Sequence, residues 1–418
     1  MQWQGNDLEN TCIEIESLLE ERYKYSGAYF LYSEEVIRKR ISYLVESLPR
    51  CTFFYSVKSL SNIHILEILH DYERVGLDVV SAGEILRAIS AGFEGNEMVF
   101  AGVGKSEKEI ILGLQKEIKS FHVESLAEIK NIARIAASIG KTARIALRVN
   151  PDIAVNTHKY ITTAKDENKF GISKSEISEA INLVTESSSL RLNGLQIHLG
   201  SQIKEVGPYI ESLKFMLKLR EEYANVENID MEYFSLGGGF GIDYNRRDDS
   251  APEDFPVAEF YSRLQPFLED NIKIALEPGR FISAYSGLLI SKILYLKEKK
   301  NFTIAICNSG MTELIRPALY EAHHPILPLV NSGKEKTYDI VGPVCESADF
   351  FALKRKMSEL IEGSRLAVLH AGAYGSVMSS NYNTRPLVPE VLLTAEGSIQ
   401  IIRKPQSVEQ ILELEAID

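Results

Sequence analysis

The sequence predicts an α/β protein: a (β/α)8 barrel of the TIM type, followed by an all-β domain. Through the first two thirds of the chain, short apolar runs rich in β-branched residues alternate with longer segments of helical periodicity. After about residue 280, short strand-like runs follow one another across turns instead. The length of 418 residues also leaves room for a second domain beside a barrel of about 250 residues.

The barrel is predicted from eight strand-like runs, the number that closes a (β/α)8 fold. These runs end at Val57, Val80, Ala101, Val123, Val149, His198, Leu236 and Leu276. Between them, segments such as SAGEILRAISAG (81–92) and KSEKEIILGLQKEI (105–118) carry apolar residues at helical spacing and charges on the opposite face. We expect these segments to be the crossover helices of a barrel that spans residues 34–279.

The second domain is expected over residues 280–418. Its strand-like runs are LLISKILYLKEKK (288–300), FTIAICN (302–308), YDIVGP (338–343), RLAVLHAG (365–372) and EVLLTAEGSIQIIRK (390–404). One more such run, GAYFLYS at 27–33, precedes the barrel and has no crossover helix before it. We expect that run to join the C-terminal sheet.

Composition narrows the class of function. Lys and Arg number 46 against 58 Asp and Glu, a net charge of −12, which argues against a nucleic-acid partner. The four cysteines show no CxxC spacing and are too few for a disulfide framework, so we expect a reducing compartment and no metal site. The chain has neither an apolar run of about 18 residues nor a secretory leader pattern, so we expect a cytoplasmic protein without a membrane partner.

Chemically active residues follow the predicted barrel strands, where barrel enzymes carry their active sites. Lys58 ends an apolar strand, and a lysine there is costly to bury unless it is paired or chemically used. The GGGFG segment (237–241) and Arg280 follow the last two strands and suit a phosphate group. A lysine beside a phosphate site favours covalent binding of pyridoxal phosphate. A tight glycine turn and a solvated lysine with an apolar stem are the alternatives.

Two further strand-end residues suit the same cofactor. Glu277 follows the eighth strand, and a carboxylate facing the pyridine nitrogen keeps that nitrogen protonated, which makes the ring a strong electron sink. His198 ends the sixth strand and is suited to lie flat against the ring. The alternative for His198 is a core histidine whose hydrogen bonds are satisfied within the protein.

Two segments of the predicted β domain also carry reactive side chains. CESADFF (345–351) places Cys345 beside Glu346 on a turn, where the cysteine is either catalytic or a small buried apolar residue. GAYGSVMSSNYNTRP (372–386) contains Tyr374 and Tyr382 among small residues and asparagines. That composition suits a polar loop that closes over a cofactor or a substrate.

Eleven motifs in order resemble those of the fold type III pyridoxal phosphate decarboxylases over nearly the whole chain. They are FYSVK, DVVSAGE, VFAGVGKSEKEI, RVNPDI, HKYITTAKDENKFGIS, HLGSQI, GGGFGIDY, EPGRFIS, SGMTELIRPALYEAHH, VGPVCESADF and GAYGSVMSSNYNTRP. Within the family, the sequence is most similar to the branch that acts on diaminopimelate. The resemblance implies an alanine racemase-like barrel with a C-terminal β domain, and pyridoxal 5'-phosphate as cofactor.

The resemblance also implies a role for each candidate residue. Lys58 would bind the cofactor covalently, His198 would stack on its ring, and Glu277 would pair with its pyridine nitrogen. The phosphate would be held by Ser201, Gly238, Gly239, Gly279, Arg280 and either Tyr374 or Tyr382. The family's active site is completed across a homodimer interface, so Cys345 and Glu346 would come from the other subunit. Cys345 would be the leading proton donor, with Lys58 as a second candidate.

The substrate that the resemblance implies is meso-2,6-diaminopimelate, with L-lysine and carbon dioxide as products. Its distal end would be held by Arg280, Arg316, Tyr320, Glu346 and Tyr382. Two guanidiniums suit a carboxylate, and Glu346 suits an ammonium group. Relatives that act on ornithine or lysine have no distal carboxylate to bind.

Three departures from the family's pattern leave alternatives open. Ser59 to Asn62 follow the lysine where Ala-Asn is usual, 308–310 reads Asn-Ser-Gly where Asp-Ala-Gly is common, and Leu387 stands where a second arginine is frequent. A related decarboxylase of lysine, ornithine, arginine or a specialised metabolite is one alternative. Another is a cofactor-binding regulatory protein without turnover, although such a carrier has no need of the CESADFF and SSNYN segments.

Overall fold

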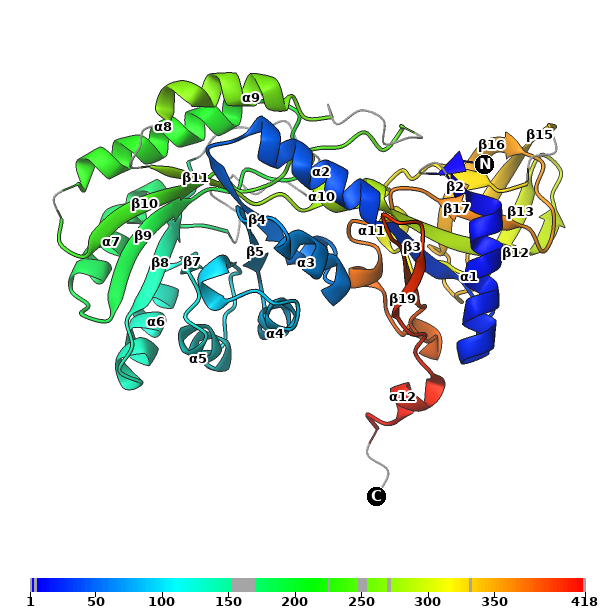
Figure 1. Ribbon diagram of the computed structural model, residues 1–418, viewed down its shortest axis with the longest axis horizontal. Coiled ribbons are helices and arrows are strands. Elements are labelled where there is room, and N and C mark those ends of the chain that lie inside the picture. Colours follow the sequence, from blue (N-terminus) through cyan, green and yellow to red (C-terminus); the bar gives the residue numbers. More distant parts are fainter. Residues whose placement is uncertain are drawn as a thin grey trace. The chain divides into compact units, whose positions relative to one another are not determined.

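The computed structural model describes residues 2–3, 6–151, 170–224, 226–246, 254–268, 272–330 and 333–415. These residues form two compact units, each with a sheet of its own (Figure 1). The first unit contains the described residues of 40–242 and 252–281, and the second contains those of 1–39, 243–251 and 282–418.

The first unit is a closed barrel of eight parallel strands, which confirms the predicted fold. Its strands, in chain order, are β4 (Cys51–Ser56), β5 (Val75–Val79), β6 (Met98–Phe100), β7 (Ser120–Val123), β8 (Ala143–Arg148), β9 (Leu190–Gln196), β10 (Ile229–Ser235) and β11 (Lys273–Leu276). The barrel closes where β11 pairs with β4, and Ile274 lies opposite Cys51. All the strands therefore end at one rim of the barrel, which brings their following loops together.

Helices follow the strands on the outside of the barrel (Figure 1). They are α3 (Ile63–His70), α4 (Ala82–Ser90), α5 (Glu107–Gln115), α6 (Leu126–Ser138), α7 (Ile177–Thr185), α8 (Gly207–Glu222) and α9 (Val257–Leu264), while α2 (Glu34–Ser47) precedes β4. Three of them begin at a serine whose hydroxyl accepts from the backbone N–H three residues later: Ser81, Ser106 and Ser125. Such caps satisfy N–H groups that a helix leaves unpaired, and each stabilises its helix by about 1 kcal/mol.

The second unit is built mostly from sheet. The strand order is β16-β15-β13-β12-β3-β18-β19, with β14 and β17 paired beside β12. The strands are β3 (Tyr29–Ser33), β12 (Gly287–Glu298), β13 (Thr303–Cys307), β14 (Ile326–Pro328), β15 (Glu335–Val341), β16 (Phe350–Ser358), β17 (Arg365–Val368), β18 (Glu390–Leu393) and β19 (Ile399–Arg403). The N-terminal strand β3 lies between β12 and β18, and therefore in the sheet that the C-terminal runs form.

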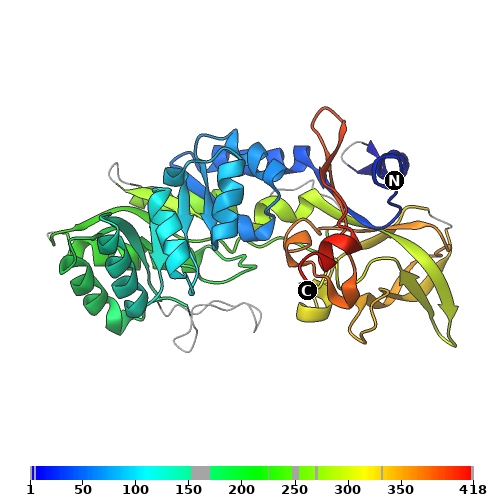
Figure 2. The same cartoon turned by 90° about the horizontal axis from the view of Figure 1, so that it is seen from below.

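A helix covers part of this sheet. Four apolar residues of α1 (Leu8–Tyr23) are buried at helical spacing: Leu8, Cys12, Ile15 and Leu19. They pack in one cluster with residues of β3, β12 and β18, and Figure 2 shows α1 beside the label N, seen nearly end-on. The remaining short elements of this unit are β1 (Gln2–Trp3), β2 (Asn6–Asp7), α11 (Arg316–Tyr320) and α12 (Val408–Leu412). None of the described helices is long and apolar enough to cross a membrane.

Candidate active site

Lys58 stands at the rim of the barrel, in the single turn of 3-10 helix directly after β4. Its Nζ donates to the Asp78 Oδ2 at 3.3 Å, and the hydroxyl of Ser56 donates to the same oxygen at 2.8 Å. The Asp78 side chain is buried, whereas 40% of the Lys58 side chain is exposed. A buried carboxylate thus holds a lysine amine that stays accessible for chemistry.

The carboxylate of Glu277 follows β11 and is almost fully buried. Ser235 donates to its Oε1 at 2.6 Å, and Gln196 donates to its Oε2 at 2.9 Å. Burial, and next the nearby Asp78 carboxylate, raise the pKa of Glu277 to about 7, against the opposing effect of the two hydrogen bonds and Lys58. A cationic partner would therefore stabilise the charged form of Glu277.

His198 lies two residues past the end of β9, and its Nδ1 accepts from the backbone N–H of Gly238 at 3.3 Å. Burial lowers the pKa of His198 well below its usual value, and the charges of Arg148 and Lys58 act in the same direction. The ring is therefore neutral, and because Nδ1 accepts, its proton is on Nε2.

The glycine loop after β10 approaches other backbone segments so closely that only glycine fits. A Cβ at Gly238 would lie 2.1 Å from the Glu277 carbonyl oxygen, and one at Gly239 would lie 2.3 Å from that of Gly200. Gly239 also has a φ of +90°, a conformation that other residues rarely adopt. At the next rim loop, a Cβ at Gly279 would meet the side chains of Ser56 and Ser59 at 3.0 Å.

Arg280 begins the short helix α10 (Arg280–Ser283), and its Nη2 donates to the Ser201 Oγ at 3.2 Å. The barrel unit thus gathers the predicted cofactor residues at the ends of β4, β9, β10 and β11. The gathered residues are Lys58, His198, Ser201, Gly238, Gly239, Glu277, Gly279 and Arg280.

The remaining predicted residues belong to the second unit. Arg316 begins α11 and is only 6% exposed. Its Nη1 donates to His324 Nε2 at 2.8 Å, while His324 Nδ1 lies 2.8 Å from the Leu369 carbonyl oxygen, to which it donates. The guanidinium carbon also lies 4.7 Å from the centre of the Tyr244 ring. His324 and Tyr244 therefore hold this buried cation in place.

The loop that carries Cys345 and Glu346 is exposed and is held through its backbone. The Cys345 N–H donates to Asn383 Oδ1 at 3.0 Å, which ties this loop to the segment that contains Tyr382. The buried Asp349 carboxylate accepts from the N–H groups of Val344 and Met311, each at 2.6 Å. The structure thus brings the CESADFF and SSNYN segments side by side.

The three tyrosines differ in exposure. Tyr382 is 47% exposed and Tyr320 is 39% exposed, whereas Tyr374 is partly buried. The choice between Tyr374 and Tyr382 as a phosphate contact stays a prediction. Of the motif HKYITTAKDENKFGIS, residues 158–169 lie outside the described part of the chain.

Sequence reasoning missed several residues that the structure brings to these positions. They are Asp78 beside Lys58, and Tyr244 and His324 beside Arg316. For Asp78 a signal was present, because an acid inside the apolar run VGLDV is costly to bury without a purpose. Among the described residues, no cluster of His, Cys, Asp and Glu side chains forms a metal site.

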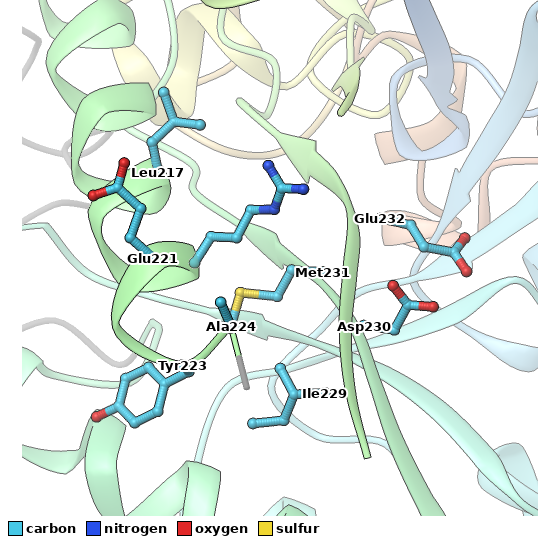
Figure 3. Close-up of a pocket in the computed structure, with 9 residues that line it drawn as sticks. Leu217, Glu221, Tyr223, Ala224, Ile229, Asp230, Met231 and Glu232 are labelled. Atoms are coloured by element: carbon cyan, nitrogen blue, oxygen red, sulfur yellow. The ribbon is translucent and has the colours of Figure 1, made fainter. Parts of the chain in front are cut away.

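A cavity of about 550 Å³ opens beside the N-terminal end of β10 (Figure 3). It is lined by Leu217, Arg220, Glu221, Tyr223 and Ala224 together with Ile229, Asp230, Met231 and Glu232. Because the catalytic rim of a barrel is at the C-terminal ends of its strands, this cavity is at the wrong end of β10 for the candidate site. None of the predicted site residues lines it.

Residues 34–284 match the family described as pyridoxal-dependent decarboxylase, pyridoxal binding domain. The chain belongs to the pyridoxal-dependent decarboxylase family. The diaminopimelate decarboxylase of Aquifex aeolicus is 39% identical over 404 residues, covering 96% of this chain and 94% of that protein. The diaminopimelate decarboxylase of Haemophilus influenzae is 40% identical over 364 residues, covering 87% of this chain and 86% of that protein.

Solved structures of decarboxylases support the same family. The crystal structure of diaminopimelate decarboxylase from Helicobacter pylori complexed with L-lysine is 36% identical, with a TM-score of 0.87. The match covers 95% of this chain and 98% of that chain. This member of the decarboxylase family is therefore a carboxy-lyase that depends on pyridoxal phosphate, as the sequence predicts.

The rim of the barrel fits pyridoxal phosphate group by group. An aldehyde requires an accessible amine, which Lys58 offers. A phosphate requires a backbone that it can approach closely, and the loop at Gly238 and Gly239 carries no side chains. A pyridine nitrogen requires a carboxylate, and Glu277 is a buried one.

Proposed function

We propose that the protein decarboxylates meso-2,6-diaminopimelate to L-lysine and carbon dioxide. The observation that carries this proposal is the similarity, over 96% of the chain, to relatives named diaminopimelate decarboxylase. The lysine in the related crystal structure is the product expected of this reaction. A further support is Arg316, a buried cation held ready for an anionic group such as a distal carboxylate.

In this proposal, the rim residues of the barrel bind and orient the cofactor. Lys58 would bind it covalently, and Asp78, which accepts from the Lys58 amine, would keep that amine at the site. His198 lies against the ring, while Ser201, Gly238, Gly239, Gly279 and Arg280, with Tyr374 or Tyr382, hold the phosphate. When bound, pyridoxal phosphate accepts the electron pair that the substrate carbon retains as carbon dioxide leaves.

Glu277 is proposed to keep a proton on the pyridine nitrogen. Its carboxylate is buried against Asp78, so a neighbouring cation relieves the electrostatic cost of its charge. Ser235 and Gln196 occupy the two oxygens with donors and so orient the carboxylate. This arrangement favours decarboxylation, because a protonated ring is the stronger electron sink.

The second unit is proposed to supply the substrate contacts and a proton. Arg316 would bind the distal carboxylate together with Arg280, and Tyr320, Glu346 and Tyr382 would complete the contacts to the distal amino-acid end. Cys345 would protonate the substrate carbon after carbon dioxide has left, with Lys58 as the other candidate. We also propose a homodimer in which Cys345 and Glu346 come from the other subunit.

A cytoplasmic location is proposed as well. All four cysteines of the chain lie among the described residues, and each is a free thiol. Free thiols, three of them buried, are typical of proteins that work in a reducing compartment.

The sharpest test concerns the distal carboxylate. Arg316→Ala should leave that charge without its partner, at a cost on the order of 2–5 kcal/mol. In kcat/KM for meso-diaminopimelate this is roughly a 30-fold to several-thousand-fold loss. Release of carbon dioxide from lysine, which lacks the group, should change little. The measurement is carbon dioxide release from meso-diaminopimelate, lysine, ornithine and arginine.

Arg355→Ala is the matched control for this test. Arg355 is also an arginine next to His324, and its Nη1 donates to the His324 carbonyl oxygen at 2.9 Å. Its removal should leave the ratio between meso-diaminopimelate and lysine unchanged. A wild-type enzyme that decarboxylates lysine or ornithine better than meso-diaminopimelate would contradict the proposed substrate.

The departures around Lys58 have local structural roles and do not favour another substrate. Ser59 is buried, and its hydroxyl donates to the Ser56 carbonyl oxygen at 2.8 Å. Leu60 is buried in the core, and Asn62 caps α3 by accepting from the His64 N–H at 3.0 Å. These residues shape the turn that carries the lysine.

A further inference from the structure

The interior of this barrel contains a line of polar side chains below Glu277. Barrels of this kind are usually filled by layers of branched apolar residues. Here, buried polar residues instead project from β7, β9 and β10: Ser120, His122, Asn193 and Tyr233. Buried polar groups are costly unless they are hydrogen-bonded, so a continuous line of them indicates a purpose beyond filling space.

Two hydrogen-bonded pairs make up the line. In the first, His122 Nε2 lies 3.0 Å from the Tyr233 hydroxyl, whose pKa the Ser120 side chain lowers. Ser120 donates to Asn193 Oδ1 at 2.8 Å, and Asn193 Nδ2 donates to the Lys119 carbonyl oxygen at 3.1 Å. The upper end of the line is His122 Nδ1, which lies 3.5 Å from Glu277 Oε1.

His122 is fully buried, and its Nδ1 has no hydrogen-bond partner at ordinary distance. The groups facing the ring are Glu277 and Tyr233, and the cations Lys105, Arg148 and Lys58 act on it from farther away. Burial first, and then these cations, lower the pKa of His122 to about 3. The ring is therefore neutral and carries one proton, on Nδ1 or on Nε2.

The direction of the hydrogen bond between Tyr233 and His122 Nε2 sets which ring nitrogen carries this proton. Burial raises the pKa of its hydroxyl, so the hydroxyl keeps its proton and can donate it. When it donates to Nε2, the ring proton is on Nδ1 and points at the Glu277 carboxylate. That proton then faces Glu277 Oε1 across 3.5 Å and adds its partial positive charge to the two hydrogen bonds from Ser235 and Gln196.

We propose that His122, oriented by Tyr233, is a positioning residue that keeps Glu277 ionised at the cofactor site. The inference rests on the role of Glu277 in the proposed function and extends it into the barrel core. Each contact favours the charged carboxylate over the neutral acid, and thereby opposes the burial and the Asp78 charge that favour the acid. Lys58 is the other group that favours the charged form.

The test is an infrared pH titration of the full-length protein after removal of the cofactor. The carboxylic acid C=O band that disappears in Glu277→Gln belongs to Glu277. His122→Phe should raise the midpoint of that band by about one pH unit, a tenfold change in the protonated fraction. His122→Asn, whose amide nitrogen comes close to the place of Nδ1, should restore most of the shift. A residue with a merely structural role would not move this midpoint.

Tyr233→Phe removes a single oxygen and is the variant least prone to misfold. It should raise the midpoint in the same direction but by less, because the ring proton is then shared between the two nitrogens. In the holoenzyme loaded with cofactor labelled with ¹⁵N in the ring, both variants should raise the unprotonated fraction of the pyridine nitrogen at high pH.

Equal midpoints in wild type, His122→Phe and Tyr233→Phe would overturn the proposal, as would a failure of His122→Asn to differ from His122→Phe. If His122→Phe does not fold, Tyr233→Phe alone decides between a shift and none. None of these measurements uses a substrate, so their outcome does not depend on which amino acid the enzyme decarboxylates. Conversely, loss of the expected substrate preference in Arg316→Ala says nothing about His122.

Discussion

Two lysines lie just after barrel strands, and their surroundings give them different roles. The Lys58 side chain is 40% exposed, and its amine donates to the Asp78 carboxylate at 3.3 Å. Lys105 is 1% exposed and donates to Glu128 at 2.6 Å and to the carbonyl oxygens of Gly102 and His122 at 2.7 Å. With its three donors in use, Lys105 supports the rim, whereas the amine of Lys58 can react.

Borohydride reduction of the holoenzyme should therefore fix the cofactor on Lys58. Peptide mapping by mass spectrometry locates the modified lysine, and Lys58→Ala should lose both the label and the visible absorbance. A label on Lys105 would contradict the assignment of the reactive amine. A label on neither residue would place that amine elsewhere in the chain.

The buried Glu277 predicts how the stability of the cofactor-free protein depends on pH. Its pKa is about 7 in the folded protein, against an ordinary 4.5. Between these values the folded chain holds a proton that the unfolded chain has lost, so stability falls as pH rises through this window and then levels. The shift corresponds to roughly 3 kcal/mol.

Denaturant unfolding at half-unit steps of pH measures this slope. Glu277→Gln should flatten it, and the exposed Glu222→Gln should not. Burial also raises the pKa of Glu84 to about 7, so part of the slope should remain in Glu277→Gln. An unchanged slope would show that Glu277 is already ionised in the cofactor-free protein.

Among the elements, the glycine loop after β10 leaves no room for an added methyl group. Gly238→Ala would place a methyl group 2.1 Å from the Glu277 carbonyl oxygen, so the loop must shift. Such overpacking costs about 1–3 kcal/mol, and we expect cofactor affinity to fall about tenfold or more. The measurement is an equilibrium titration of the visible absorbance.

Gly207→Ala is the control for that loop. Gly207 is at the first turn of α8, and a Cβ there would have no atom within 4 Å. It should bind the cofactor as wild type does. Equal affinity in Gly238→Ala would mean that this loop does not approach the phosphate.

The strands were predictable because their pattern is local. The first predicted run ends at Val57, where β4 ends at Ser56, and the last ends at Leu276, as β11 does. Contacts between elements were not predictable in this way. Tyr233 reaches His122 across 111 residues of sequence, and Ser235 reaches Glu277 across 42. The first pairing joins strands β7 and β10, which are not neighbours in the barrel, and the second joins β10 to the residue that follows its neighbour β11, so no single segment encodes either.

In the whole molecule, the predicted site residues divide between the two units. Lys58 and Glu277 belong to the barrel, whereas Cys345 and Glu346 belong to the unit built mostly from sheet. The proposed homodimer with shared sites predicts what fraction of the active sites is restored when two inactive variants are mixed. Lys58→Ala and Cys345→Ala should each be inactive alone, and random exchange should restore about a quarter of the sites, because half of the pairs carry one intact site of two.

Native mass spectrometry would verify the exchange, and carbon dioxide release would measure the recovery. A mixture of two Lys58→Ala preparations is the control and should recover nothing. Full exchange without recovered activity would show that each site is built within one chain.

The position of β3 sets the order in which the chain can fold during synthesis. Tyr29 to Ser33 leave the ribosome early, yet their sheet neighbours are near Leu288 and Leu392. The barrel strands are all complete by Leu276, so the barrel can close while β3 still lacks both neighbours. A nascent chain halted before residue 390 would carry β3 with an unpaired edge, a surface that invites aggregation. Chaperone demand should therefore be greatest late in translation, and it should fall once β18 has emerged.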